Sequence, residues 1–233
     1  MRSPVELTWL DGERPEDVIR ALAPWVGDER RARLDEVLDR RLAGITVCVE
    51  NLHDPHNGAA AIRSLEAHGV QALHVVETLE PFRFSPRVTQ GCDKWIDLVR
   101  HKSFAAAAAG LRARGFKLYA AVPGAHLALE EVPVDTPAAF CFGNEHDGLS
   151  DEAIAACDDT FGIPMFGFTE SFNLSVSVAL SIRDAARRRR AVVGPTDLDE
   201  ATRLRLRARW LALSLDARAA QGIFERTRAV GAT

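Results

Sequence analysis

The chain has 233 residues, of which 47% are hydrophobic, and its formal net charge is −4 at pH 7. This hydrophobic content excludes a disordered chain, and the length suits one α/β domain with extensions or at most two small domains. The mild negative charge argues against a protein that coats nucleic acid non-specifically, although it is compatible with a local basic patch.

The N-terminal half is predicted to begin with an irregular segment and then to alternate between helices and strands. Residues 1–28, with prolines between Trp9 and Trp25, predict an extension. An amphipathic helix is expected over 29–41, where apolar residues share one face among arginines. A continuous β-branched run over 44–52 predicts a buried parallel strand. After it we expect a helix over 57–70, a strand over 72–77, a helix over 103–115 and a strand over 117–122.

The C-terminal half continues this alternation. The elements expected there are a strand over 138–145, a helix capped by Ser150, a short strand ending in 162–165, a long helix that starts within 169–180 and a last helix over 197–221. Strands that alternate with helices predict an α/β fold with a mostly parallel sheet and helices on both faces.

Cysteine use and the lack of long apolar segments indicate a cytoplasmic protein. Four cysteines without CxxC spacing are typical of small buried residues in a reduced protein. The first residues turn acidic and lack the apolar core of a signal peptide. No apolar run approaches the roughly 20 residues that span a bilayer, so no membrane association is expected.

Three stretches share one arrangement, in which a strand ends, a tight loop follows and polar side chains open a helix. In the first, 50–69, Asn57 is placed to cap the helix and Arg63 follows among alanines. His53 and His56 have HxxH spacing, but no further ligand-rich cluster joins them. Ordinary loop residues are therefore favoured over a metal site.

The second stretch, 140–153, ends a buried strand at Gly143 and continues with Glu145 and a helix capped by Ser150. Ligands of open α/β sheets bind at the carboxyl ends of strands, and Gly143 would let a ligand approach the backbone there. The stretch has neither GxGxxG spacing nor the lysine of a P-loop, so neither NAD nor a P-loop nucleotide is supported.

The third stretch, 163–190, has Ser171 and Asn173 where a buried helix begins. Ser171 alone satisfies the first turn as a cap, which leaves Asn173 as a surplus polar group that needs a partner. Small residues one turn apart predict close packing on another element, such as a second copy of the chain. Arg183 and the run 187–190 exceed what a helix dipole needs, so they predict a phosphate-facing patch.

The three stretches resemble, in this order, motifs one, two and three of the SPOUT superfamily of S-adenosylmethionine-dependent RNA methyltransferases. The closest branch is that of the TrmH (SpoU) 2′-O-ribose methyltransferases. The residues that carry the resemblance are "NLHDPHNGAAAIRSLEAHGV", "FCFGNEHDGLSDEA" and "IPMFGFTESFNLSVSVALSIRDAARRR". The stretch from "GCDKWIDLVRHK" to "LYA" and the helix over 29–41 also resemble the branch that methylates guanosine 18 in the tRNA D-loop.

The resemblance implies a deep trefoil knot with S-adenosyl-L-methionine bound bent inside it. It also implies an obligate homodimer in which residues of the second copy finish each site, with tRNA as the RNA partner and no metal. It covers the chain from about residue 30 to 190. We therefore expect an N-terminal extension over 1–28, a catalytic knot domain over 29–190 and a C-terminal helical extension over 191–233.

Roles carry over position by position from the resembling motifs. The expected catalytic residues are Asn57, Arg63, Glu145, Ser171 and Asn173, the cofactor-binding residues are Ala121, Gly143, Ile163 and Phe172, and the RNA-binding residues are His56, Arg187 and Arg189, joined by Arg183 from the arginine patch. The chain departs from the family pattern at Ser64 and Leu65, where Thr and Cys are usual, at Ala121 for Thr, and at Phe172 for Leu.

The role of Arg63 is left open between two hypotheses. The family proposal makes it the base, whereas a guanidinium with a pKa above ~12 suits a clamp for the phosphate beside the target ribose. Two other functions are weighed. Enzymes that methylate ribosomal RNA often carry an added N-terminal RNA-binding domain, and only about 28 residues precede the first helix here, which favours tRNA. A catalytically silent RNA-binding SPOUT protein is disfavoured because the five expected catalytic residues are retained.

Overall fold

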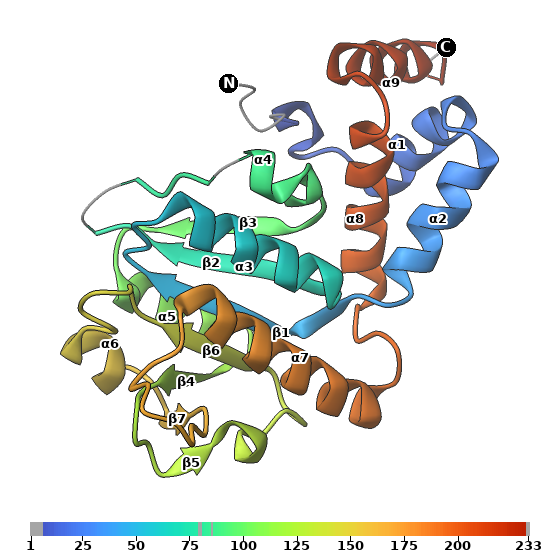
Figure 1. Cartoon of the computed structure of the whole chain (residues 1–233). Coiled ribbons are helices and arrows are strands. Elements are labelled where there is room, and N and C mark those ends of the chain that lie inside the picture. Colours follow the sequence, from blue (N-terminus) through green and yellow to red (C-terminus); the bar gives the residue numbers. More distant parts are fainter. Residues whose placement is uncertain (1–6, 79–80, 85, 232–233) are drawn as a thin grey trace. The chain divides into compact units, whose positions relative to one another are not determined.

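A computed structural model describes residues 7–78, 81–84 and 86–231, and the chain divides into two compact units (Figure 1). The central unit comprises residues 42–197, and the terminal unit combines the residues before 42 with those after 197. These boundaries differ from the expected ones at 28 and 190. The difference arises because the helix that follows residue 27 packs on the C-terminal segment, where Arg207 donates to Asp35 at 2.8 Å.

The central unit is built on a seven-stranded parallel sheet with the order β3-β2-β1-β6-β4-β7-β5. Its strands are β1 (Leu42–Glu50), β2 (Val70–Val76), β3 (Asp97–His101), β4 (Lys117–Ala121), β5 (Leu127–Ala128), β6 (Ala138–Phe142) and β7 (Asp159–Gly162). The carboxyl ends of all these strands therefore meet at one edge of the sheet.

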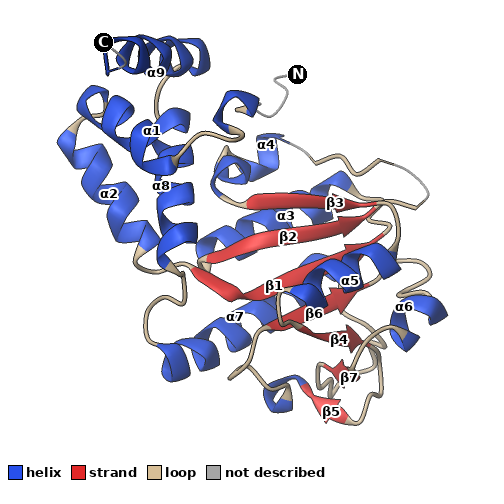
Figure 2. Cartoon of the chain, turned by 180° about the vertical axis from the view of Figure 1, so that it is seen from behind, coloured by secondary structure: helices blue, strands red, loops and turns tan. Residues whose placement is uncertain are grey.

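Helices cover both faces of this sheet. One face carries α3 (Pro55–Ala67) and α7 (Leu174–Val193), with the short α4 (Pro86–Thr89) beside α3, and the other carries α5 (Phe104–Ala113) and α6 (Asp151–Ala155), as Figures 1 and 2 show. Val47 and Val49 pack in the cluster beneath α3 and α7, whereas Cys48 packs in the cluster with α5. A strand buried on both faces needs apolar residues throughout, which explains the continuous run at β1. The predicted α/β fold is confirmed.

The terminal unit consists of α1 (Pro15–Leu22), α2 (Asp28–Leu38), α8 (Glu200–Leu213) and α9 (Ala217–Gly231). The sequence prediction was wrong here in two places. The segment 1–28, expected to be irregular, contains α1, which buries Val18 and Leu22. The single helix expected over 197–221 is two helices. Ser214 is the C-cap of α8, and Asp216 Oδ1 accepts the Arg218 and Ala219 N–H groups at 3.1 and 3.2 Å where α9 begins.

Among the described residues, no helix combines the length and the apolar character that crossing a lipid bilayer requires.

Candidate active site

A cavity of about 390 Å³ lies at the carboxyl ends of β4, β6 and β7, where three loops meet. Its volume falls within the ≈300–1,000 Å³ range of small-molecule sites, and its place at the strand ends is where open α/β sheets bind ligands. Apolar walls come from Phe142, Phe161, Ile163, Met165 and Leu174, and polar groups come from Asn144, Glu145, His146, Ser171 and Ser177.

The structure brings six of the predicted site residues together in this cavity. They are the four expected cofactor residues, Ala121, Gly143, Ile163 and Phe172, and two of the expected catalytic residues, Glu145 and Ser171. They come from the end of β4 and from the loops after β6 and β7, and they converge because these strands are parallel neighbours.

Asn57 reaches the cavity through Glu145. It is 8% exposed in the first turn of α3, and its Nδ2 donates a hydrogen bond to Glu145 Oε1. The expectation that Asn57 caps α3 was wrong, because the Asp54 carboxylate accepts the His56 N–H at 2.8 Å and Asp54 is the N-cap. The Asn57 amide is thereby available to join the first predicted motif to the second.

Ser171 and Asn173 exchange the roles that the sequence suggested. Asn173 is the N-cap of α7, and its Oδ1 accepts the Ser175 N–H at 2.9 Å and the Ser175 hydroxyl at 2.7 Å. Ser171 lies three residues before the helix begins, too early to cap it, and lines the cavity instead. The surplus polar group at the mouth of α7 is therefore Ser171.

Gly143 lacks a side chain for a different reason from the one expected. A Cβ at this position would lie 1.8 Å from the Gly148 carbonyl carbon and 2.0 Å from the Leu149 nitrogen. The loop after β6 folds back on itself this closely, held by Asn144 Oδ1, which accepts the His146 and Asp147 N–H groups at 2.8 Å each. The small residue is required by the loop's own packing, and it lines the cavity as a consequence.

Arg63 is not brought to the cavity of its own chain. Its side chain is exposed on α3, and Nη1 donates to the Val88 carbonyl at 2.9 Å. An α-helix turns about 100° per residue, so six residues put Arg63 about 240° around α3 from Asn57. Arg63 therefore points to a different side of the helix.

Comparison with known proteins identifies the family. Residues 44–183 match the SpoU rRNA Methylase family. The chain belongs to this family. The tRNA (guanosine(18)-2′-O)-methyltransferase of Borreliella burgdorferi is 33% identical over 193 residues, which are 82% of this chain and 88% of that protein. The Thermus thermophilus protein of the same name is 37% identical over 163 residues, 70% of this chain and 84% of its own length. The Aquifex aeolicus TrmH/SpoU tRNA modifying enzyme has a TM-score of 0.73 at 26% identity, covering 81% of this chain and 98% of the other.

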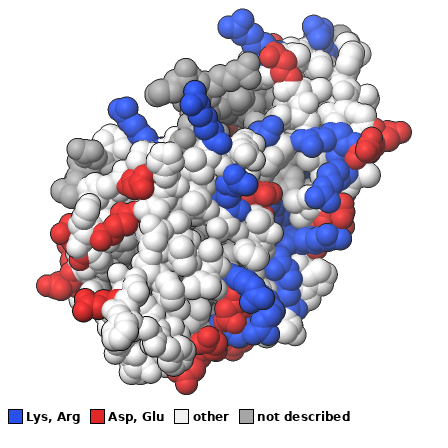
Figure 3. All heavy atoms as spheres, in the orientation of Figure 1, with Lys and Arg blue, Asp and Glu red and all other residues white. Residues whose placement is uncertain are grey.

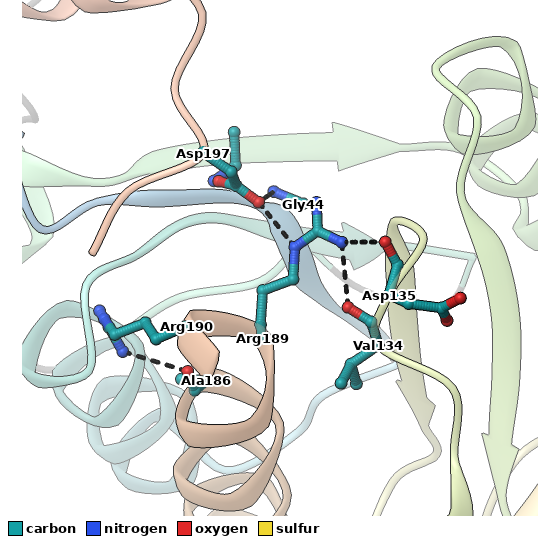
Figure 4. Close-up of polar contacts among 8 residues, drawn as sticks. Gly44, Val134, Asp135, Ala186, Arg189, Arg190 and Asp197 are labelled. Carbon is teal, nitrogen blue, oxygen red and sulfur yellow. Dashed lines mark hydrogen bonds and ion pairs between the residues drawn. The ribbon is translucent and has the colours of Figure 1, made fainter. Parts of the chain in front are cut away.

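The arginine run at the end of α7 in this SpoU-family chain serves the fold more than its surface. The RNA-binding assignment of Arg189 was wrong, because this residue is 7% exposed. Its Nε pairs with Asp197 at 2.9 Å, and its Nη1 donates to the Val134 and Asp135 carbonyls at 3.0 and 2.6 Å (Figure 4). A Cβ at Gly44 would lie 2.6 Å from the Arg189 guanidinium, so this position also excludes a side chain.

The neighbours of Arg189 are engaged in a similar way. Arg188 donates to the carbonyls of Leu129 and Val132 at 3.1 and 2.7 Å, and Arg190 donates to the His68 carbonyl at 2.8 Å. Of the predicted RNA-binding residues, His56, Arg183 and Arg187 remain exposed. Basic and acidic side chains lie beside one another over this part of α7 (Figure 3), and Arg187 pairs with Asp184 at 3.2 Å.

Within the described ranges there is no group of three or more His, Cys, Asp or Glu that could hold a metal ion. The His146 ring lies 6.5 Å from that of His53, across the loops that Asn57 and Glu145 join. The sequence did not single out Asn144, His146 or Met165. Each lies within two residues of a predicted strand end, and that position was the only available signal.

Proposed function

We propose that this chain transfers a methyl group from S-adenosyl-L-methionine to a ribose 2′-hydroxyl of tRNA, that of guanosine 18. The observation that carries the proposal is the convergence of six predicted cofactor and catalytic residues on one cavity at the strand ends. Two relatives named tRNA (guanosine(18)-2′-O)-methyltransferase, 33% and 37% identical over most of their lengths, support the substrate. The reaction is expected in the cytoplasm and without a metal.

The residues at the cavity fit this cofactor in chemical kind. Phe142, Phe161 and Ile163 offer apolar walls for an adenine ring, and the Glu145 carboxylate offers a negative charge toward a sulfonium. When bound, S-adenosyl-L-methionine supplies a methyl group that its sulfonium has already activated. The tasks left to the protein are to hold the ribose in line with that methyl and to let the hydroxyl proton leave.

We also propose that the segment around α7 forms the trefoil knot of the SPOUT superfamily. The strand order supports this, because β7 is the second strand from one end of the sheet, and the chain returns from it through α7 to pack on the central strand β1. The arginines of α7 support it further, because Arg188 and Arg189 hydrogen-bond to four backbone carbonyls between Leu129 and Asp135, in the segment that joins β5 to β6.

A second copy of the chain is proposed to complete each site by bringing its Arg63 to the cavity. Arg63 is exposed and does not line its own cavity, and beside the Nη1 bond to the Val88 carbonyl its guanidinium has further donors that can act in another. Val176 and Leu180 are 42% and 38% exposed one turn apart on α7. An exposed apolar line of this kind is typical of an interface.

Complementation between two inactive variants tests the shared site. We expect Arg63→Ala and Glu145→Ala each to lose methyl transfer. Mixed dimers of the two would regain one intact site, and random assortment gives about a quarter of the wild-type activity. No recovery in a mixture whose exchange is verified by two differently tagged chains would contradict a site built from both copies.

The role of Arg63 is proposed to be electrostatic. A guanidinium cannot accept a proton near neutral pH, but its five donors suit a phosphate oxygen or developing negative charge. Losing such a preorganised donor costs about 10²–10³ in kcat. Arg63→Lys keeps the charge but loses the planar fork. We therefore expect its rate of single-turnover methyl transfer to be lower than that of the wild type by about this factor. Near-normal turnover would exclude the bidentate clamp.

The proposed activity is tested with tritium-labelled methyl donor and three RNAs. An unmodified tRNA transcript should be labelled, and the same transcript with a 2′-deoxyguanosine at position 18 should not, because the acceptor hydroxyl is gone. Label in ribosomal RNA alone would reassign the substrate. Absence of label in any RNA, with the cofactor bound, would support the catalytically silent protein.

A further inference from the structure

Two phenylalanine side chains stand in solvent on the loop between β7 and α7. The exposed fraction is 99% for Phe166 and 108% for Phe168, whereas Phe172 on the same loop is 39% exposed. Burying a side chain of this size contributes about 1.5–3 kcal/mol. The chain forgoes that gain at two neighbouring positions, which marks a surface for a partner.

The same loop borders the cavity on its other side. Met165 and Ser171 line the cavity, and the two exposed rings project from the residues between them. Gly167 separates the rings, and apart from its two chain neighbours no atom lies within 4 Å of the place that its Cβ would take. The rings are therefore open to solvent beside the mouth of the cavity.

We propose that Phe166 and Phe168 stack on nucleobases of the RNA substrate, at or next to the nucleotide whose ribose is methylated. This inference rests on the proposed function, because that function brings a ribose to the cavity that this loop borders. Proteins that recognise RNA loops receive unstacked bases on aromatic side chains. An open phenyl ring beside the reacting ribose provides such a platform without selecting one base by hydrogen bonds.

A second copy of the chain is the competing partner for this apolar surface. The residues around the rings argue against a second copy of the chain. Thr169 and Glu170 are exposed directly after Phe168, and a protein interface that covered the rings would also draw the Glu170 carboxylate toward its core, where charged residues are depleted. A stacked base covers a ring face alone and leaves that carboxylate in water. The line of Val176 and Leu180 on α7 remains for the second copy.

Alanine and tyrosine variants at the two positions separate stacking from folding. We expect Phe166→Ala and Phe168→Ala each to raise the Kd for an unmodified tRNA transcript about 5- to 150-fold, since stacking contributes ≈1–3 kcal/mol per base. The KM for tRNA should rise with it. The Kd for S-adenosyl-L-methionine and the molar mass in solution should not change. Phe166→Tyr and Phe168→Tyr keep the ring and should stay within about twofold of wild type.

Val192→Ala is the matched control, because Val192 is 59% exposed at the end of α7 and lies outside the cavity lining. An unchanged RNA Kd in the double alanine variant would overturn the proposal. A fall in its molar mass would overturn it in favour of the second copy. If wild-type protein methylates no RNA while the alanine variants still weaken tRNA binding, the proposed function fails and the stacking surface stands.

Discussion

The two ends of α7 both carry polar residues that the sequence marks as functional, and the fold uses them in opposite ways. At the N-terminal end, one residue, Asn173, caps the helix, and Ser171 remains in the cavity-lining loop. At the C-terminal end, the guanidinium groups donate hydrogen bonds to backbone carbonyls of the chain itself, as seen for Arg188, Arg189 and Arg190. The first end contributes to the candidate site, and the second holds neighbouring segments together.

The difference follows from how many partners each side chain can satisfy. A helix N-terminus gains a cap from one short acceptor, so a second polar residue beside it stays available for a ligand. A guanidinium carries five donors on a long stem and can bind several carbonyl groups at once. Backbone carbonyls near the end of α7 therefore bind most of the arginines in this run. The number of arginines in the sequence cannot tell which of them remain available to bind RNA.

Arg189→Ala is expected to have the largest effect on stability. The substitution leaves the Asp197 carboxylate, whose side chain is 8% exposed, without its cationic partner and removes the donor to the Val134 and Asp135 carbonyls. Breaking a buried ion pair in this way costs about 3–5 kcal/mol of unfolding free energy. Thermal unfolding followed by circular dichroism should show a melting temperature lowered by roughly 6–20 °C.

The control for this prediction is Arg187→Ala, two residues earlier on the same helix but exposed. Its surface ion pair with Asp184 contributes at most about 1 kcal/mol. If the two variants melt within about a degree of each other, the contrast between the buried and exposed arginines of α7 is wrong, because it predicts several-fold different costs.

The sequence predicted the layers of the fold because each layer has a local pattern. Continuous apolar runs mark strands that are buried on both faces, as in β1, and Ser150 was correctly expected to cap the helix after β6. The convergence of the loops could also be expected, since parallel strands end at one edge. The family resemblance assigned Ala121, Gly143 and Ile163 to one cofactor site, and the structure places them around one cavity because β4, β6 and β7 are neighbouring strands.

The details that were missed depend on single hydrogen bonds or on distant segments. Helix boundaries that shift by two or three residues move the cap from Asn57 to Asp54, and likewise from Ser171 to Asn173. The Arg189 side chain is buried because it pairs with Asp197, eight residues later, and with carbonyls about 54 residues earlier. No local pattern reports such partners, so the sequence could not separate Arg189 from Arg187.

Substitutions at Asn173 and Ser171 test the N-terminal end of α7, and we expect them to change stability less than Arg189→Ala does. Asn173→Ala removes the cap and should cost about 1 kcal/mol of unfolding free energy, and Asn173→Asp should retain the cap because aspartate accepts the same bonds. Ser171→Ala should leave the unfolding free energy within about 0.5 kcal/mol and lower methyl transfer. Urea unfolding and steady-state kinetics measure both quantities on each variant.

The Asn173→Asp variant decides whether Asn173 also acts in the site. It preserves the accepting oxygen and loses the amide donor. If it unfolds like wild type and transfers methyl groups like wild type, Asn173 is a cap alone, and the predicted catalytic role is wrong. Stability retained with slower transfer would assign the amide donor a part in the reaction.

Arg187→Ala is expected to have the smallest effect on stability and a specific effect on RNA. Its guanidinium is exposed at the end of α7, so it can meet a phosphate where Arg189 cannot. One lost phosphate contact lowers the slope of log Kd against log salt by about 0.7–0.9 and weakens tRNA binding at low salt. Filter binding over a salt series measures this, with Arg112→Ala, on α5 at the other face of the sheet, as the control for loss of one surface charge. If the slope of log Kd against log salt is the same for Arg187→Ala and Arg112→Ala, Arg187 makes no specific phosphate contact. The arginines at the C-terminal end of α7 would then stabilise the fold without contributing to RNA binding, in contrast to the N-terminal end.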